Sequence, residues 1–545
     1  MTAIDDFFIR ISFVILLTAG YPFIGVSQDR YPPKGVSQDR YSPKGVSQDK
    51  YPPKGVSRET ATLDIRIDLN RTYQTISNFA ASDAWSCQFV GNWPEPAKDS
   101  IADWLFSMDT IAGGDPKGIG LSLWRFNIGA GSARQGEASG IKDEWRRTDL
   151  WQHQQGQQWF LKAAGQRGVQ QFLGFFNSPP AQLTTNARAY ADNGRCNIDS
   201  AHYSAFAQYS VDVLKGIKQT TGITLDYISP VNEPQWDWSD GGQEGSPYTN
   251  REISGLVKAF SAALLDQHLT TRILVPESGE HKYLWEEGNK PGRGNQVTAF
   301  FNSSSPSYIG DLPNVCKTVA SHSYFTTSPF SRAIEIRKKI AHDIASAGNL
   351  DYWQSEYCIL GDNAGEINGG SRDLGINAAL YMAGVIHADL VYGNAAAWQW
   401  WLAISPYNYK DGLIYIDKNK TGGSYHDSKM LWALGNYSRF IRPGMKRVYA
   451  SASPPAANRA SFPSSDSILI SAWKDEKKKK LVIVVVNRSL EYLPLTLSTS
   501  TGNAITSQWS AYTTSSTKNL GKQTLSSNQA EIPPQSLITF ETSYK

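Results

Sequence analysis

Two glutamates, Glu233 and Glu356, each follow a short apolar run of the kind that predicts a buried strand. These runs cover residues 225–231 and 352–355. A carboxylate at the C-terminal end of a strand lies where a parallel α/β barrel carries its chemistry. Two facing carboxylates can cleave a glycosidic bond, because one protonates the leaving oxygen and the other meets the developing oxocarbenium ion. We therefore expect a glycoside hydrolase that acts with retention of configuration.

The neighbours of Glu233 fit the role of the acid/base. Tyr227, Trp236 and Trp238 place apolar mass nearby, which would raise the pKa of the carboxyl and keep it protonated for the first step. Asn232, the residue before it, can donate a hydrogen bond to the sugar 2-hydroxyl. An asparagine that only forms a turn next to a proline is the alternative for Asn232.

Glu356 is the expected nucleophile, which must stay ionised. Arg125, near the end of the candidate strand 120–128, is the natural cation to hold that charge, and Tyr324 could donate a hydrogen bond to the same carboxylate. His322 could orient the acid or a sugar hydroxyl. A structural salt bridge for Arg125 and a core histidine for His322 remain the alternatives.

Further carboxylates follow other candidate strands. Glu277 comes after 272–276 and is the main rival to the pair, but its strand would place it beside the pair rather than across from Glu356. We interpret it as supporting the site or binding substrate. Asp83 could bind a sugar hydroxyl, and capping a helix is an equal alternative.

Five short motifs at candidate strand ends form one pattern. They are Trp-Arg-Phe at 124–126, Asn-Ser-Pro-Pro at 177–180, Asn-Glu-Pro at 232–234, His-Ser-Tyr at 322–324 and Ser-Glu at 355–356. Together they resemble family 30 glycoside hydrolases, over roughly residues 61–543. That family consists of retaining β-glycosidases with the acid/base after barrel strand four and the nucleophile after strand seven. The resemblance implies a (β/α)8 barrel whose associated β-sandwich is built from both ends of the chain. Residues 83–87 and 123–132 look most like the branch of endo-β-1,6-galactanases.

The resemblance also implies a tryptophan floor under the reacting sugar. Trp398 matches the tryptophan that the family keeps after strand eight, and alternation should direct Trp400 or Trp401 into the core. Many members carry an aromatic residue after the Ser-Pro-Pro segment, where this chain has Ala181 or Gln182. The sugar pocket should therefore be wider or more polar. No arginine arrangement for a glucuronate branch is evident.

The order of apolar runs predicts the elements that must position these residues. Strand-like runs alternate with amphipathic helical stretches at 204–218, 253–268, 333–345 and 375–390, which predicts a (β/α)8 TIM barrel over 76–442. Residues 443–545 contain only strand-like runs, which predicts an antiparallel β-sandwich. The alternating strand within 61–75 has no helix partner and should join this sandwich. The eight barrel strands are expected at 76–81, 120–128, 171–177, 225–231, 272–276, 318–324, 352–355 and 395–401.

The N-terminus indicates export. Residues 1–27 contain a short apolar stretch at 11–19 and are interpreted as a signal peptide, although a buried N-terminal segment or a misassigned start would also account for them. Residues 25–60 repeat a ten-residue unit rich in proline, glycine and charge, which predicts a disordered spacer. The expected location is secreted or extracytoplasmic.

Composition excludes several other functions. The chain carries 53 Lys+Arg against 50 Asp+Glu, which gives no reason to expect nucleic acid or, once the signal is removed, a membrane as partner. The 17 Trp and 26 Tyr suit a polysaccharide cleft. No cofactor or metal is implied, and a monomer is expected. A carbohydrate-binding barrel without hydrolysis, and other family 30 specificities, remain alternatives. The cysteines could form disulfides or stay free: Cys87, Cys196, Cys316 and Cys358.

Overall fold

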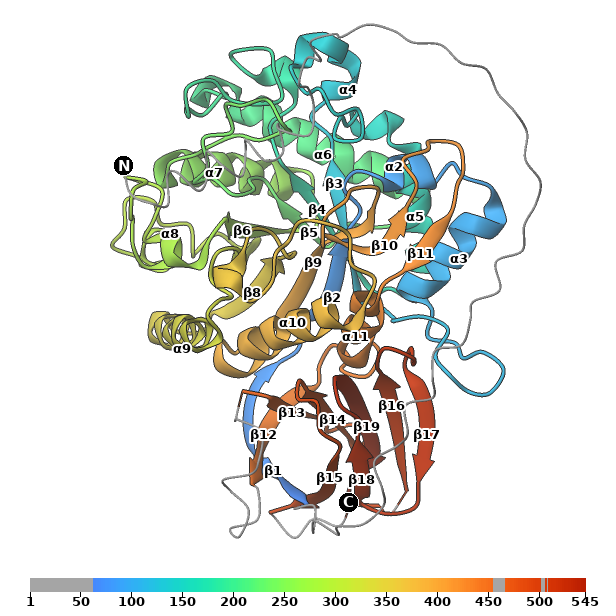
Figure 1. The fold of residues 1–545 in the computed structure, drawn as a ribbon. Helices are drawn as coiled ribbons and strands as arrows, with labels where there is room; N and C mark the ends of the chain where they lie inside the picture. The colour runs from blue at the N-terminus through green and yellow to red at the C-terminus, as the bar shows by residue number, and fades with distance from the viewer. Residues whose placement is uncertain (1–61, 454–465, 501–504, 507) are drawn as a thin grey trace, which may run out of the picture. The chain divides into compact units, whose positions relative to one another are not determined.

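The computed structural model describes residues 62–453, 466–500, 505–506 and 508–545 (Figure 1). The expected signal peptide, 1–27, and the repeat spacer, 25–60, lie outside the described residues. None of the helices in the described part of the chain is long and apolar enough to cross a membrane.

A closed parallel barrel forms the larger part of the fold. Each strand pairs in parallel with the next, and β9 pairs with both β8 and β2, which closes the ring. This confirms the predicted (β/α)8 fold. The barrel strands are β2 (Asn78–Ser82), β3 (Leu123–Ile128), β4 (Gln171–Phe176), β5 (Tyr227–Ser229), β6 (Arg272–Ser278), β7 (Val315–His322), β8 (Asp351–Glu356) and β9 (Ala397–Ser405). Two further strands, β10 (Gly412–Ile416) and β11 (Tyr425–Asp427), extend the sheet beyond β9.

Every predicted barrel strand overlaps an observed one, but β5 is shorter than its apolar run. It ends at Ser229 because Pro230 has no N–H to donate to a neighbouring strand. The released segment then turns, which places Glu233 in the loop above the barrel.

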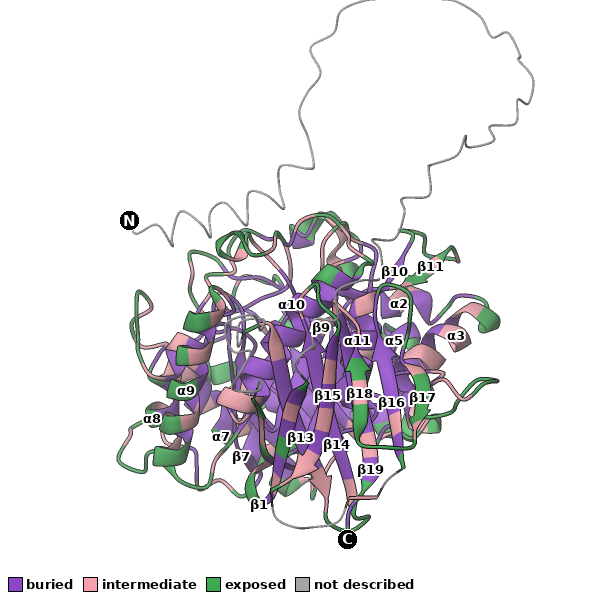
Figure 2. Ribbon diagram, turned by 60° about the horizontal axis from the view of Figure 1, so that its bottom comes forward, coloured by how far each residue is buried: buried purple, intermediate pink, exposed green. Residues whose placement is uncertain are grey.

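Helices surround the barrel. The helix α9 has one buried and one exposed face (Figure 2), whereas α10 is buried on nearly every side. The helix α7 begins with a capping box between Thr249 and Glu252. The helices are α2 (Cys87–Val90), α3 (Glu95–Phe106), α4 (Ser132–Gln135), α5 (Gln155–Gln166), α6 (Tyr203–Thr221), α7 (Asn250–Asp266), α8 (Gln296–Phe301), α9 (Phe330–Ala347), α10 (Ile376–His387) and α11 (Lys429–Ser438).

The barrel interior changes from apolar to polar along its strands. Leu123 on β3 and Trp353 on β8 belong to an apolar interior cluster. Two residues further along the same strands, and therefore on the same side, stand Arg125 and Ser355. The barrel interior is therefore apolar near the N-terminal ends of the strands and polar near their C-terminal ends.

The second sheet is mostly antiparallel and has nine strands. The strand β1 lies inside this sheet, between β12 and β15, antiparallel to β12 and parallel to β15. In order across the sheet the strands are β17 (Gly521–Leu525), β16 (Trp509–Thr514), β19 (Ser536–Ser543), β14 (Lys480–Asn487), β13 (Ile468–Asp475), β12 (Lys446–Ser453), β1 (Leu63–Thr75), β15 (Leu493–Thr499) and β18 (Gln529–Ile532).

The strand β14 is buried on both faces. Val482, Val484 and Val486 belong to the core that continues into the helices of the barrel, whereas Ile483 and Val485 face the sheet's own core. At the same boundary Asn436 on α11 donates its Nδ2 to the Thr539 hydroxyl on β19 at 2.9 Å. This double burial explains why the run is continuously apolar rather than alternating.

The sequence leaves open whether the cysteines form disulfides or stay free, and the structure answers this. All four are free thiols, and Cys87, Cys316 and Cys358 are buried. Burial raises the pKa of the Cys316 thiol to about 12, so this group is unreactive.

Candidate active site

Glu233 is fixed in the loop after β5 by its backbone. It adopts a φ of 47°, which is uncommon for a residue other than glycine. Its N–H donates to the Glu277 carbonyl at 2.8 Å, and its own carbonyl accepts from the Trp238 indole at 3.1 Å. These contacts direct the carboxylate over the barrel mouth.

Glu356 ends β8 and is held from two sides. Arg125 donates from Nη1 to Oε2 at 2.5 Å, and the Tyr324 hydroxyl donates to Oε1 at 3.0 Å. Arg125 is completely buried, and its guanidinium lies 3.8 Å from the centre of the Phe175 ring. Its second nitrogen donates to Asn232 Oδ1 at 3.2 Å, which leaves the Asn232 amide nitrogen as the group able to donate to a ligand.

The two glutamates meet across a short gap. One oxygen of Glu233, one oxygen of Glu356 and a ring nitrogen of His322 all lie within 4.8 Å of one another. Retaining glycosidases hold their carboxyl groups about 5–5.5 Å apart, whereas inverting ones need about 6.5–9.5 Å to admit a water. The gap therefore favours retention.

His322 bridges two of the carboxylates. Its Nδ1 lies 3.0 Å from Glu233 Oε1, and its Nε2 lies 3.2 Å from Glu277 Oε2. Burial alone would lower the pKa of His322, but the negative charge of Glu356 and the bonds to Glu233 and Glu277 outweigh it and raise that pKa to about 9. His322 is therefore a cation that donates to both partners at neutral pH.

Glu277 is completely buried and contacts no solvent. The Ser229 hydroxyl donates to Oε1 at 2.6 Å, and the Ser355 hydroxyl donates to Oε2 at 2.5 Å. Burial would raise the pKa of Glu277, but the charge of Arg125 and the bond from His322 lower it overall. This geometry supports a role in holding the site together rather than in touching substrate.

The environment of Glu233 raises the pKa of its carboxyl and so favours the protonated form. Burial is the main cause of its raised pKa, and the negative charge of Glu356 adds to it, whereas hydrogen bonds from His322 and the Trp236 side chain oppose it. Trp236 is partly exposed and meets Phe325 edge-on, with ring centroids 6.2 Å apart. Trp236 thus lies beside the candidate acid, where it can also contact a sugar.

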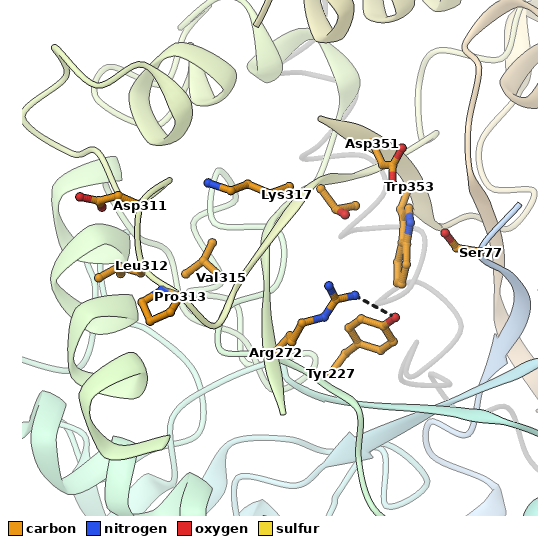
Figure 3. A pocket seen from close by; sticks show the side chains of 11 residues that line it. Ser77, Tyr227, Arg272, Asp311, Leu312, Pro313, Val315, Lys317, Asp351 and Trp353 are labelled. Carbon is orange, nitrogen blue, oxygen red and sulfur yellow. Dashed lines mark hydrogen bonds between the residues drawn. The ribbon is translucent and has the colours of Figure 1, made fainter. Parts of the chain in front are cut away.

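Tyr227 is not among these neighbours, so that part of the sequence interpretation is wrong. It begins β5, and Arg272 donates to its hydroxyl at 3.2 Å (Figure 3). Both line a hollow of about 310 Å³ at the N-terminal ends of the strands, with Trp353 and Asp351 also in its wall. In a barrel of this kind, that end contributes stability rather than chemistry.

Asp83, directly after β2, is enclosed by protein. It is completely buried, accepts from the Asn127 N–H at 2.7 Å and accepts from the Gln157 amide at 3.0 Å. Burial raises the pKa of Asp83 to about 8. These contacts support a role in fixing the end of β3 rather than in binding a sugar hydroxyl.

Trp398 faces the opposite way from the sequence prediction. It is completely buried in the core outside the barrel and donates its indole N–H to Asp389 at 3.0 Å. Trp401 faces the interior instead, partly exposed, with its ring 5.3 Å from that of Trp85. Two positions earlier Gln399 bonds to Asn78 of β2, so Trp401 continues that inward face. Trp401 is therefore the candidate for the aromatic floor that the sequence prediction assigned to Trp398.

The segment after Ser-Pro-Pro supplies no aromatic residue to this floor. Ala181 is buried against Ala130 and Ala189, and Gln182 is exposed. Trp401, on β9, and Trp85, in the turn that follows β2, therefore form an aromatic pair where the barrel closes.

Comparisons with known proteins agree with this geometry. An endo-beta-1,6-galactanase from Hypocrea rufa is 24% identical over 455 residues, which are 79% of this chain and 82% of that protein. Glucuronoxylanase XynC from Bacillus subtilis is 24% identical over 70% of this chain and 75% of its own length. The crystal structure of a conserved exported protein from Bacteroides fragilis is 33% identical with a TM-score of 0.78, covering 88% of this chain and 100% of that one.

The family itself follows from a match over most of the barrel. The model of O-glycosyl hydrolase family 30 matches residues 62–415, a range that includes the acidic pair and every barrel strand. With two carboxylates across one short gap at the C-terminal ends of these strands, the chain belongs to O-glycosyl hydrolase family 30 and is a retaining O-glycoside hydrolase.

Proposed function

We propose that this protein is an endo-β-glycosidase that hydrolyses β-1,6-galactan by double displacement, with Glu233 as acid/base and Glu356 as nucleophile. The observation that carries the roles is the difference between the two environments. Glu233 has a raised pKa, whereas Glu356 accepts from the Arg125 guanidinium and the Tyr324 hydroxyl. A protonated acid and an ionised nucleophile across one gap are what the first step requires.

In the first step a carboxylate oxygen of Glu356 attacks the anomeric carbon while Glu233 gives its proton to the leaving oxygen. The bond to the leaving sugar breaks and a glycosyl-enzyme ester forms. Glu233, now ionised, takes a proton from water as that water attacks the same carbon and releases Glu356. The configuration is inverted twice and therefore retained. Asn232, anchored to Arg125, would donate to the 2-hydroxyl in both steps.

The sugar specificity rests on the relatives' names and is the finer part of the proposal. An endo-beta-1,6-galactanase and a glucuronoxylanase match at equal identity, so a xylanase is the competing candidate. A panel of β-1,6-galactan, β-1,6-glucan, xylan and arabinogalactan, with products followed by size and by anomeric configuration in early NMR spectra, separates them. We expect β-anomers of intermediate length from galactan. Cleavage of xylan alone would contradict the galactanase proposal.

The two roles are tested by leaving-group dependence. Glu233→Gln should lose most activity on the polysaccharide but still release an activated nitrophenol, which needs no proton. Glu356→Gln should lose both, because no nucleophile remains. Glu335→Gln, an exposed residue on α9, is the matched control and should keep full activity. Equal loss on both substrates for Glu233→Gln would refute its role.

We also infer export through residues 1–27, with residues 76–442 as the catalytic barrel and 61–75 plus 443–545 as the sandwich. The apolar run at 11–19 supports export, as does the similarity to the exported protein from Bacteroides fragilis. Fractionation of the native host, with N-terminal sequencing of the mature protein, tests it. An intact N-terminus on intracellular protein would contradict it.

A further inference from the structure

The chain leaves its strand before it reaches Tyr324. The strand β7 ends at His322, which pairs with Glu356 on β8, and a bond from the Ser323 N–H to the Glu356 carbonyl at 3.2 Å extends this pairing by one residue. Tyr324 lies beyond it, and the next residue, Phe325, adopts a φ of 61°, which is uncommon for a bulky side chain. Strand pairing therefore does not explain why the Tyr324 hydroxyl stands 3.0 Å from Glu356 Oε1.

A buried ion pair outside the barrel wall holds this segment on both sides of Tyr324. Arg337 of α9 donates from Nε to Asp389 Oδ1 at 2.8 Å, and both side chains are completely buried. Before Tyr324, the Ser323 hydroxyl donates to the Asp389 carboxylate, whose oxygens lie at 3.0 and 3.2 Å. After Tyr324, Arg337 Nη1 donates to the carbonyl of Thr326 and, at 3.0 Å, to its hydroxyl.

The segment 323–326 is also closed on itself, because the Thr326 hydroxyl donates to the Ser323 carbonyl at 2.8 Å. Its two ends are thus tied to each other and to the ion pair. Burial would raise the pKa of Asp389, but the charge of Arg337 and the neighbouring His281 lower it overall. Asp389 is therefore ionised at neutral pH, and the pair keeps both charges.

Stability alone does not account for this arrangement. A buried ion pair loses the hydration of both charges, and apolar residues of similar volume often stabilise a fold equally well. Here the arginine donates in the fixed directions of its planar fork, and the carboxylate accepts from a hydroxyl of the same segment. Directional bonds of this kind determine where segment 323–326 lies.

On the basis of the proposed glycosidase function, we propose that Arg337 and Asp389 are positioning residues, which keep the Tyr324 hydroxyl on the nucleophile Glu356 by fixing segment 323–326. Neither of them reaches the substrate. The Tyr324 bond stabilises the carboxylate that attacks in the first step and leaves in the second. Displacement of the hydroxyl should therefore slow the reaction more than it weakens substrate binding.

Two neighbouring threonines test this with the same substitution. Thr326→Val removes the hydroxyl that Arg337 holds, whereas Thr327→Val removes a similarly buried hydroxyl that lies 3.0 Å from that of Tyr381. The substrate is the polysaccharide that the wild type cleaves best, and kcat is expressed per active site titrated with a covalent inhibitor. Thr326→Val should lower kcat about tenfold with little change in KM, and Ser323→Ala should resemble it. Thr327→Val should keep both constants, and equal falls in the two threonine variants would overturn the proposal.

Combination with Tyr324→Phe shows whether the effect passes through the tyrosine. Tyr324→Phe removes the hydroxyl itself and should lower kcat about tenfold or more. Adding Thr326→Val to Tyr324→Phe should then cost less than about twofold further, because the group to be positioned is already gone. Losses that multiply as if independent would overturn the proposal.

Conservative replacement of the cation gives a further measurement. Arg337→Lys keeps a charge beside Asp389 and should retain more kcat than Arg337→Gln, which leaves that carboxylate buried without its cation. Urea unfolding identifies any variant that fails to fold, and the threonine pair decides the question in that event. Equal kcat in folded Arg337→Lys and Arg337→Gln would contradict the assignment.

The proposed function and this inference fail in different ways. Unchanged hydrolysis in Glu356→Gln would refute the proposed function, whatever these variants do. An inactive Glu356→Gln together with independent losses in Thr326→Val and Tyr324→Phe would refute the positioning role alone.

Discussion

Glu277 carries a buried charge next to the proposed catalytic pair, Glu233 and Glu356. No solvent reaches it, yet Arg125 and His322 keep it ionised. In return it helps hold His322 in the charged form, and His322 donates to Glu233, the proposed acid/base. We therefore assign Glu277 as a positioning residue, because its influence on the reaction passes through the imidazolium.

Replacing Glu277 with glutamine tests this chain of influence. Glu277→Gln keeps the shape but removes a negative charge, so the pKa of His322 should fall from about 9 toward its ordinary value. NMR titration of the labelled imidazole measures it, and kcat should fall more than KM changes. Ser229→Ala, which removes a bond to Glu277 but no charge, is the control. An unchanged His322 titration in Glu277→Gln would refute the coupling.

Sequence reasoning located the residues that stand at strand ends. Glu233, Glu356 and Arg125 lie together because parallel strands in register bring their C-terminal ends to one edge. It misplaced Tyr227, because a residue at the start of a strand lies the whole strand length from the chemistry. The contacts of Glu277 depend on side-chain packing, and no spacing in one sequence reveals them.

At the scale of elements, strand β9 shows why some positions resist prediction. Its run Trp398-Gln399-Trp400-Trp401 puts tryptophan on both faces whichever phase is chosen, so alternation cannot identify the inward one. In the structure an irregularity in the pairing with β2 follows Trp400, and both Trp401 and Leu402 contact the interior. Periodicity established the strand, and only its partners fix which residues face inward.

Substitution of Trp401 should therefore affect activity, whereas substitution of Trp398 should affect stability. Trp401→Ala removes a sugar platform, so kcat/KM should fall about tenfold with little loss of stability. Trp398→Phe leaves Asp389 without an indole donor and should cost about 1–3 kcal/mol in urea unfolding, with kcat/KM unchanged. Kinetics and unfolding of both variants check this. Loss of activity in Trp398→Phe alone would restore the sequence prediction.

At the scale of the molecule, one continuous core joins the barrel helices to the second sheet. Residues of β14 and β13 pack in the same cluster as α10 and α11. His387, the last residue of α10, lies near Arg447 of β12 and Arg488. Burial, aided by these two cations, lowers the pKa of His387 to about 3.

This histidine should make the junction sensitive to acid. The unfolded chain protonates His387 near pH 6.5 and the folded chain near pH 3, so stability is full above pH 6.5 and falls as the pH is lowered through that window. The slope is about 1.4 kcal/mol per pH unit for one proton. His387→Gln should flatten the profile of unfolding free energy between these values. His426→Gln, on the exposed position of β11, should not; identical profiles for all three proteins would contradict the assignment.

The position of β1 between two later strands of the second sheet sets an order of events during synthesis. Its partners β12 and β15 come from residues 446–499, so the earliest described strand leaves the ribosome long before either is made. The barrel strands are synthesised between β1 and β12. During that time both edges of β1 are unpaired and could form hydrogen bonds with a wrong strand. Deleting the first described strand, β1, or the last one, β19, should therefore destabilise the same sheet.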